Sequence, residues 1–206
     1  MTPHRPWPKA FVVPLAAGIV CLWVSAANSA DILSADVHHE GDRYFLSLKA
    51  YLDAPPTAVF AVITDYDRLH ELHRRIRESR LLRRVDADTA EVYTRFWGCL
   101  AGIFCKGMEQ VERVEEVPPF ELHATVIAEQ SDLASGTVSW RLAPDGAGTL
   151  LSYESRMDPD FWVPPVIGDG LLKRSISRTT RDMIQRVEER ARALATGEGG
   201  PGTEQP

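Results

Sequence analysis

The segment 171–195, LLKRSISRTTRDMIQRVEERARALA, constrains the fold more than any other part of the chain. Its apolar residues recur every three or four positions, with arginine and glutamate between them. This pattern predicts an amphipathic helix of about 25 residues. Such a helix needs a partner surface for its apolar stripe, and we expect that surface to be the concave face of a sheet. The predicted stripe consists of Leu172, Ile176, Met183, Val187, Ala191 and Leu194.

The residues before this helix supply the expected sheet. Apolar and polar residues alternate over 43–53, which predicts a half-buried strand. Pro55 and Pro56 end this strand and predict a short helix beginning near Pro56, followed by a second short helix over 67–76. Strand signals separated by turn residues then recur, as is typical of an antiparallel meander. They cover 78–85, 89–99, 103–114, 120–129, 137–142 and 149–157.

Both ends of the chain are expected to lie outside the folded domain. Residues 1–30 contain two basic residues, the apolar run 11–24 and then a series of small residues, which is the layout of a secretory signal peptide. The apolar run is shorter than the roughly 18 residues needed to cross a bilayer. We therefore expect a cleaved signal, a periplasmic or secreted protein, and a domain over 31–195. The tail 196–206 has almost nothing to bury and is expected to be disordered.

The charge balance bears on the kind of partner. The chain has 23 Lys and Arg against 29 Asp and Glu, a net charge of −6, and removal of Arg5 and Lys9 with the signal would make it −8. A general nucleic-acid binder needs a basic stripe to neutralise phosphates. We therefore expect no nucleic-acid partner.

Two cysteines, Cys99 and Cys105, would remain after signal cleavage. Gly98 and Gly102 predict a tight turn between strands, and a three-residue loop over 101–103 would place Cys99 opposite Cys105. In an oxidising compartment such a pair favours a disulfide. Two buried free thiols, or thiols with a chemical or metal-binding role, are the alternatives. A zinc site would need more Cys or His ligands than this stretch supplies.

His70 and His73 form a second candidate metal-binding pair, because they lie one turn apart on the predicted second helix. The pair doesn't match H-E-x-x-H, and three neighbouring arginines would repel a cation. We therefore expect a solvated helix face at this position and no metal site.

Three stretches of the sequence carry a family resemblance. They are APPTAVFAVITDYDRL at 54–69, GTVSWRLAPDGAGTLLSYE at 136–154 and DFWVPPVIGDGLLKR at 160–174. They resemble the helix-grip proteins of the START and birch-pollen-allergen type, above all the polyketide cyclase/dehydrase and coenzyme-Q-binding branch. The resemblance implies an α+β helix-grip fold, in which a curved antiparallel sheet of about seven strands wraps around a long C-terminal helix, with two short helices after the first strand. None of the stretches is a catalytic signature, so they specify a fold more than a function.

The resemblance also implies an apolar cavity between sheet and helix, with the loop 160–168 at its mouth. This loop is almost continuously apolar, so it caps the core, forms a gate or membrane-touching lip, or makes a partner interface. Trp140 is expected on the inward face of its strand, and Tyr153 or Arg156 could orient a ligand, with Glu154 and His123 as further polar candidates. The expected ligand-contacting residues are Trp140, Tyr153, Arg156, Phe161, Trp162, Val166, Leu172 and Ile176.

The motifs favour binding over catalysis. The sequence shows no Ser-His-Asp order, phosphate loop or dinucleotide fingerprint, and its polar candidates form no pair that requires acid–base chemistry. We expect no cofactor and a monomeric, exported protein that binds or transports a hydrophobic small molecule such as a lipid, quinone or polyketide-like compound, with transient membrane contact. The alternatives are a cyclase or dehydratase acting on an aromatic or polyketide-type substrate, and a ligand-free interaction module of the cell envelope.

Overall fold

The computed structural model describes residues 30–100, 104–160 and 169–197. Within these ranges, the side chains of residues 99, 100, 104 and 169–177 are not described. The predicted signal segment, most of the apolar loop 160–168 and most of the tail therefore lie outside the described residues.

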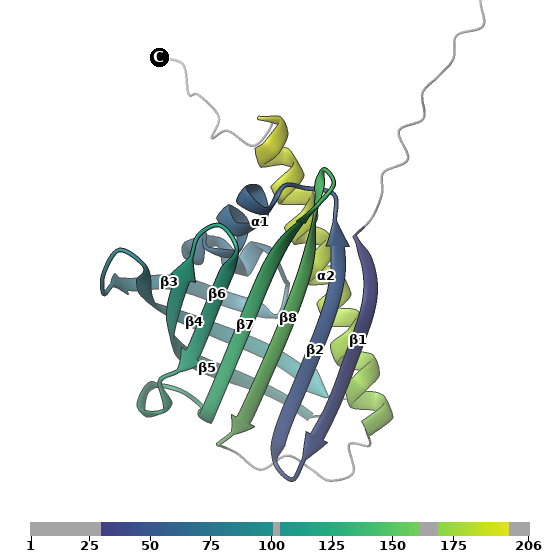
Figure 1. Cartoon of the computed structure of the whole chain (residues 1–206). Helices are drawn as coiled ribbons and strands as arrows, with labels where there is room; N and C mark the ends of the chain where they lie inside the picture. The colour runs from purple at the N-terminus through teal and green to yellow at the C-terminus, as the bar shows by residue number, and fades with distance from the viewer. Residues whose placement is uncertain (1–29, 101–103, 161–168, 198–206) are drawn as a thin grey trace, which may run out of the picture.

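The chain folds into one curved antiparallel sheet of eight strands, in the order β1-β2-β8-β7-β6-β5-β4-β3. Figure 1 shows the curvature, because β3, β4 and β5 run across the view behind the upright strands β7, β8, β2 and β1. This arrangement confirms the expected α+β helix-grip fold. The strands are β1 (Asp31–Glu40), β2 (Arg43–Leu52), β3 (Ile76–Arg84), β4 (Thr89–Leu100), β5 (Phe104–Val117), β6 (Glu121–Val126), β7 (Leu133–Asp145) and β8 (Gly148–Pro159).

The expected count of about seven strands is one too low, because β1 was not predicted. β1 pairs with β2 from Asp31 opposite Tyr51 to Glu40 opposite Arg43, and Gly41, with a φ of 60°, lies in the turn between them. β1 is an edge strand on which Val37 alone is buried. Ile32 and Ala35 of β1 pack against the core, but a register shift between Ile32 and Ser34 interrupts the alternation of apolar and polar residues that would have indicated a strand.

The helices are α1 (Pro56–Ile63), α2 (Asp169–Thr196) and the short 3₁₀ helices η1 (Tyr66–Glu71) and η2 (Ala128–Gln130). α1 begins at Pro56, as predicted, because a proline at the first helical position needs no hydrogen-bond partner for its nitrogen. The second predicted helix is shorter than expected, since η1 ends at Glu71 and β3 already begins at Ile76. No helix in the described ranges is long and apolar enough to span a membrane.

The core lies between the concave face of the sheet, α1 and α2. On α2, Ile184, Val187 and Ala191 are completely buried, and they pack in one cluster with sheet residues such as Leu48 and Leu151. Figure 1 shows α2 crossing behind β8, β2 and β1, on the side toward which the sheet curls. The helix is confirmed. Of the predicted stripe, Val187 and Ala191 are buried and Met183 is partly buried, whereas the side chains of Leu172 and Ile176 lie outside the described part of the structure.

The stripe differs from the prediction at two positions. Ile184 lies at its centre, whereas Leu194, near the end of α2, is 47% exposed. The helix projects past the sheet at this end in Figure 1, so the sheet offers no surface to cover Leu194.

The hairpin predicted from the cysteine spacing is present. β4 and β5 pair in one continuous antiparallel register, in which Cys99 lies opposite Cys105 and Val92 lies opposite Glu112. The three residues of the predicted loop, 101–103, lie outside the described residues. The register that the spacing implied is therefore confirmed along both strands.

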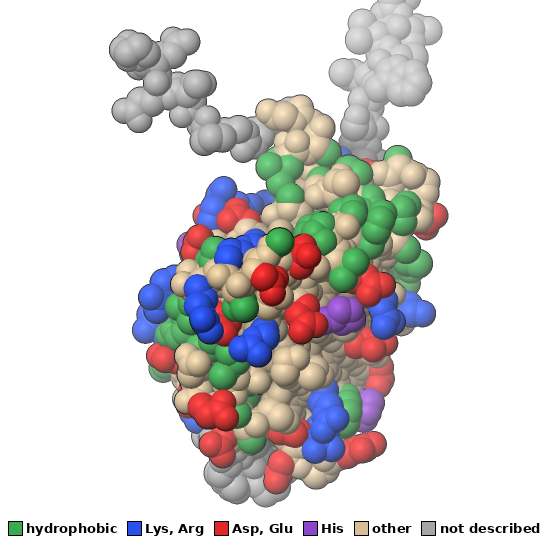
Figure 2. Space-filling model, turned by 60° about the vertical axis from the view of Figure 1, so that its left-hand side comes forward, with side chains coloured by type: hydrophobic (Ala, Val, Ile, Leu, Met, Phe, Trp, Pro, Cys, Tyr) green, Lys and Arg blue, Asp and Glu red, His purple; other side chains and the backbone are tan. Residues whose placement is uncertain are grey.

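The outer face of this hairpin is covered by ion pairs. Glu91 accepts hydrogen bonds from Arg83 at 2.8 Å and from Arg113 at 3.2 Å, and Arg95 contacts Glu78 at 3.1 Å. Figure 2 shows acidic and basic side chains interspersed over one side of the molecule. Mixed charges of this kind keep a surface hydrated without a strong field of one sign. The inner face of the sheet is different, and it contains the candidate site.

Candidate functional site

A cavity of about 440 Å³ lies between the concave face of the sheet, α1, η1 and α2. Its volume falls within the range of small-molecule sites, about 300–1,000 Å³. Most of the lining is apolar and comes from elements far apart in the sequence. The apolar residues that represent these elements are Leu46, Ile63, Leu69, Ile76, Val92, Val114, Leu122, Val138, Trp140, Met157, Met183 and Val187.

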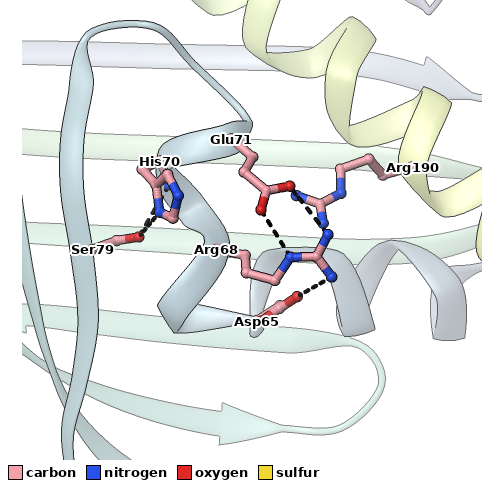
Figure 3. A network of polar contacts seen from close by, with 6 residues as sticks. All are labelled: Asp65, Arg68, His70, Glu71, Ser79 and Arg190. Atoms are coloured by element: carbon pink, nitrogen blue, oxygen red, sulfur yellow. Dashed lines mark hydrogen bonds and ion pairs between the residues drawn. The ribbon is translucent and has the colours of Figure 1, made fainter. Parts of the chain in front are cut away.

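η1 forms one wall of the cavity and is held from two sides. Figure 3 shows Arg68 between two carboxylates, with Glu71 at 3.0 Å and Asp65 at 3.7 Å. Glu71 also contacts Arg190 of α2 at 3.0 Å. On the other side, the backbone N–H of His70 donates to the hydroxyl oxygen of Ser79 on β3 at 3.0 Å. These contacts hold η1 between α2 and β3, so that its apolar residues line the cavity.

The expectation that His70 and His73 share a solvated helix face is wrong for His73. η1 ends before His73, and the chain then turns, so the two side chains lie in different surroundings. His70 is exposed, whereas His73 is 4% exposed and lines the cavity. Burial and the nearby Arg75 lower the pKa of His73, which favours its neutral form. The described residues contain no cluster of three or more His, Cys, Asp or Glu that could hold a metal ion.

A carboxyl group, that of Glu112, lines this mostly apolar cavity. Glu112 lies on β5 between Val92 of β4 and Val126 of β6, and both valines also line the cavity. Burial raises the pKa of Glu112 to about 7, although a hydrogen bond with the Gln110 side chain acts in the opposite direction. Glu112 therefore exchanges its proton near neutral pH, which is unusual for a carboxyl group.

Several hydroxyl groups accompany Glu112 in the cavity lining, and three of them lie on β4 and β8. Tyr153 and Ser155 lie on the inward face of β8, and Thr94 lies on β4 opposite Gln110. Burial raises the pKa of Tyr153 to about 12, so its phenol keeps its proton. The Thr94 hydroxyl is buried and has no hydrogen-bond partner among the residues that the structure describes. Buried polar groups are normally paired, so an unpaired hydroxyl in a cavity marks a place where a ligand or water can bind.

Two of the predicted ligand-contacting residues meet in the cavity. Trp140 on β7 and Tyr153 on β8 are direct partners in the sheet register, and their rings contact edge to face with centroids 4.7 Å apart. Both line the cavity opposite Thr180, Met183 and Val187 of α2. The strand parity that placed Trp140 on the inward face is confirmed.

Arg156 doesn't contact the cavity. Inward and outward residues alternate along β8, and Arg156 has the opposite parity to Tyr153. Its side chain is 47% exposed and lies 4.0 Å from Asp158. Glu154 is likewise outward on β8, and His123, whose side chain is 40% exposed, contacts Glu121 at 3.2 Å. An alternating strand cannot direct both Tyr153 and Arg156 into the same cavity.

The remaining predicted residues cannot be placed. Phe161, Trp162 and Val166 lie outside the described residues. Leu172 and Ile176 belong to α2, but their side chains are not described.

Glu112, Gln110 and Thr94 were not predicted as site residues. The inward face of β5 could not be assigned from the sequence, because charged residues interrupt the alternation of apolar and polar residues along this strand. The predicted pairing of Cys99 with Cys105 already implied that Val92 lies opposite Glu112. A glutamate opposite an inward valine on an antiparallel ladder was therefore the signal that could have identified this site.

Comparisons with known proteins agree with this geometry. A family model described as "Polyketide cyclase / dehydrase and lipid transport" matches residues 46–192, which is most of the chain. No curated protein matches the chain in sequence.

Several solved structures share the fold. The Zhui aromatase/cyclase from Streptomyces sp. R1128 aligns with a TM-score of 0.61 at 14% identity, over 77% of this chain and 99% of that one. A START superfamily protein from Mycobacterium smegmatis aligns with a TM-score of 0.56 at 15% identity, over 73% and 98%. A STAR-related lipid transfer protein from Xanthomonas axonopodis aligns with a TM-score of 0.51 at 12% identity, over 77% and 98%. At these identities the likeness concerns the fold alone.

Proposed function

Because the chain belongs to the polyketide cyclase/dehydrase and lipid-transport family, we propose that it binds a hydrophobic small molecule between the sheet and α2 and carries it unchanged. The observation that carries this proposal is the cavity of about 440 Å³, whose lining is mostly apolar with a small group of polar side chains on one wall. Sites for hydrophobic ligands have this composition, since apolar walls supply binding energy and a few polar groups set orientation.

The polar groups of the cavity support carriage more than chemistry. Among the described lining residues, Glu112 is the single carboxyl group, and its nearest polar neighbours are the Gln110 amide and hydroxyl groups. Tyr153 keeps its proton across the physiological pH range because burial raises its pKa. His73 also lines the cavity, but Glu112 and His73 do not contribute to each other's pKa shift. The set can therefore hold a hydrogen-bonding ligand, but these two groups do not form the coupled acid and base that most acid–base enzymes place on either side of a reacting bond.

A cyclase or dehydratase is the second candidate, and one observation favours it. The pKa of Glu112, about 7, is that of an efficient general base at neutral pH. An enzyme of this kind would release a changed product, whereas a carrier returns the ligand that it took up. Mass spectrometry of a bound polyketide-type ligand before and after prolonged incubation therefore separates the two functions.

The expected export supplies the proposed setting. A periplasmic or extracellular protein of this family would exchange its ligand with membranes by transient contact, as a monomer. This setting rests on the features of residues 1–30 and on the cysteine pair. N-terminal sequencing of protein recovered from the bacterial periplasm would test it, and an uncleaved Met1 in that fraction would contradict it.

We predict that Cys99 and Cys105 form a disulfide in exported protein, since they are direct partners across β4 and β5. Thiol alkylation of folded protein without reductant should then label neither cysteine, and labelling after reduction should modify both. The bond closes a short loop, so its reduction should lower the free energy of unfolding by only about 2 kcal/mol. Labelling of both cysteines in unreduced, periplasm-derived protein would show that the disulfide is absent.

Replacement of Trp140 with alanine tests the binding function directly. Trp140 is half-buried and lines the cavity, so we expect the variant to lose about 1–2 kcal/mol of stability, less than the 3–5 kcal/mol typical of a fully packed tryptophan. We also expect its affinity for a neutral fluorescent probe such as N-phenyl-1-naphthylamine to change at least about fivefold, because the indole forms part of the wall.

The control for this experiment is Arg141→Ala, the exposed neighbour of Trp140 on β7, which should bind the probe as the wild type does. Extraction of the native protein followed by mass spectrometry should identify a co-purifying hydrophobic molecule. If the wild type binds no hydrophobic probe and yields no extracted ligand, the carrier function is wrong and the ligand-free interaction module is favoured.

A further inference from the structure

Four of the polar side chains that line the cavity lie together on one part of its wall. Glu112 and Gln110 are successive inward residues of β5 and share a hydrogen bond. Thr94 lies directly opposite Gln110 in the register and therefore diagonally from Glu112. Tyr153 faces the same space from β8, close enough for the charge of Glu112 to raise its pKa further. We call Thr94, Gln110, Glu112 and Tyr153 the Glu112 cluster.

The cluster contains both donors and acceptors but no cation. The Thr94 hydroxyl can donate and accept, the Tyr153 phenol donates, and a protonated Glu112 donates through one oxygen and accepts through the other. The charge of Glu112 acts on two phenols, those of Tyr66 on η1 and Tyr153 on β8, and both keep their protons because burial raises their pKa. A further titratable lining residue, His73, does not contribute to the pKa shift of Glu112, and burial lowers the pKa of His73 and favours its neutral form. The other elements face the cavity here with uncharged side chains, which are Val92, Val126, Trp140, Thr180, Met183 and Val187.

The cationic lining residues belong to another part of the cavity. Lys106 is six residues from Glu112 along β5, which corresponds to about 20 Å of extended strand. The backbone of Arg75 is bonded to that of Trp97, because its carbonyl oxygen accepts a hydrogen bond from the Trp97 N–H. Trp97 lies five residues along β4 from Val92, the residue opposite Glu112, so the backbone of Arg75 is also distant from Glu112. Neither Lys106 nor Arg75 contributes to the pKa shift of Glu112, which comes from burial and the hydrogen bond with Gln110. An anionic group placed at the cluster would therefore be buried without a counter-charge, which is costly.

From this arrangement we propose that the ligand carries an uncharged carbonyl or hydroxyl group that hydrogen-bonds to Glu112, and that the cluster rejects a carboxylate or phosphate at this position. The inference rests on the proposed binding function and specifies the chemical class of the ligand. A carbonyl oxygen accepts a hydrogen bond from the protonated carboxyl group of Glu112, and the unpaired Thr94 hydroxyl offers a second hydrogen bond. The rest of the ligand is apolar, in keeping with the valines and Trp140 around the cluster.

Carbonyl and hydroxyl groups differ in what they require from Glu112. A ketone can only accept a hydrogen bond, so it needs Glu112 in its protonated form. An alcohol can also donate to the ionised form. Binding of a ketone should therefore weaken as pH rises through about 7, where Glu112 loses its proton, and binding of an alcohol should change little.

Four probes of equal chain length test the proposal: 2-dodecanone, 1-dodecanol, dodecanoate and dodecylamine, each displacing N-phenyl-1-naphthylamine from the wild-type protein at pH 6 and pH 8.5. We expect the affinity for the ketone to fall about tenfold between the two pH values, and that for the alcohol to fall less than about threefold. At pH 8.5, dodecanoate should bind at least about tenfold more weakly than the alcohol.

Two variants of the same strand make the test specific. Glu112→Gln keeps a donor at every pH, so the ketone should bind about equally at pH 6 and pH 8.5. Glu115→Gln is a matched control, because Glu115 is exposed on the outward face of β5, and it should keep the wild-type pH dependence. Loss of the pH dependence in Glu112→Gln with its retention in Glu115→Gln identifies the carboxyl group that contacts the ligand.

The outcomes separate the failure of the inference from that of the proposed function. If the probes bind but the ketone shows no pH dependence, or if dodecanoate or dodecylamine binds more tightly than the alcohol, the inferred ligand class is wrong and the binding function stands. If no probe displaces the dye and the dye itself does not bind, the proposed function fails.

Discussion

Replacement of Ile184 with alanine is expected to lower the free energy of unfolding by about 3 kcal/mol. Ile184 lies on α2, is completely buried, and packs in the core cluster with residues of α1 and of the sheet. The change removes apolar contacts and leaves a void that the surrounding side chains can fill only in part. Urea unfolding at equilibrium, followed by circular dichroism, measures the difference as a shift of the midpoint at constant slope.

The matched control lies on the same helix. Leu194 is also a large apolar residue of α2, but 47% of its surface is exposed. Leu194→Ala should change the free energy of unfolding by no more than about 0.5 kcal/mol. A loss below about 1 kcal/mol for Ile184→Ala, or equal losses for the two variants, would show that this face of α2 isn't packed against the sheet as described.

Replacement of Glu112 with glutamine is expected to stabilise the protein at high pH and to leave it unchanged at low pH. The pKa of Glu112 is about 7 in the folded protein, because burial disfavours the charged form, and its ordinary value is 4.5. The folded state thus holds this proton more tightly than the unfolded chain does. The stability that Glu112 confers is complete below about pH 4.5 and is lost as pH rises through about 7.

The expected difference follows from the size of this shift. Each pKa unit corresponds to about 1.4 kcal/mol in the free energy of unfolding. Because Glu112 lines a cavity and is not enclosed in the packed core, its charged form is penalised less than in full burial, and we expect a difference of about 2 kcal/mol between the variant and the wild type. Glu112→Gln should be more stable than the wild type by that amount at pH 8.5 and equal to it within about 0.5 kcal/mol at pH 4.5. Urea unfolding at both pH values measures this, with Glu115→Gln as the control that should match the wild type. Equal stability of Glu112→Gln and the wild type at pH 8.5 would mean that Glu112 is hydrated and titrates normally.

Much of the fold could be predicted because its elements have strong local signals. The amphipathic period of α2, the proline at the start of α1 and the alternation around Trp140 each reflect an element with one buried and one exposed face. The family resemblance carried by 54–69, 136–154 and 160–174 is confirmed by the family match over residues 46–192. These signals are local, so each element can be predicted without knowledge of the elements that pack against it.

The candidate site was less predictable. Tyr153 lines the cavity, as expected, but Arg156 does not. Residues three positions apart on a strand lie on opposite faces, so Tyr153 and Arg156 cannot both point into the cavity. Glu112 was missed because a charged residue on a strand is expected to face solvent. β1 was missed because a register shift between Ile32 and Ser34 interrupts the alternation of its apolar residues, although Ile32 and Ala35 pack against the core.

Most of the helical and extended segments, the β4–β5 register and the family could be inferred from the sequence, because these depend on the order of residues within short stretches. Which residues share the cavity depends on the packing of distant elements. Glu112, Tyr153, Trp140 and Met183 come from β5, β8, β7 and α2, and the curvature of the sheet brings them around one space. Their surroundings also decide their chemistry, since removal from water raises the pKa of Glu112 to about 7, and no neighbour in the sequence could produce this burial.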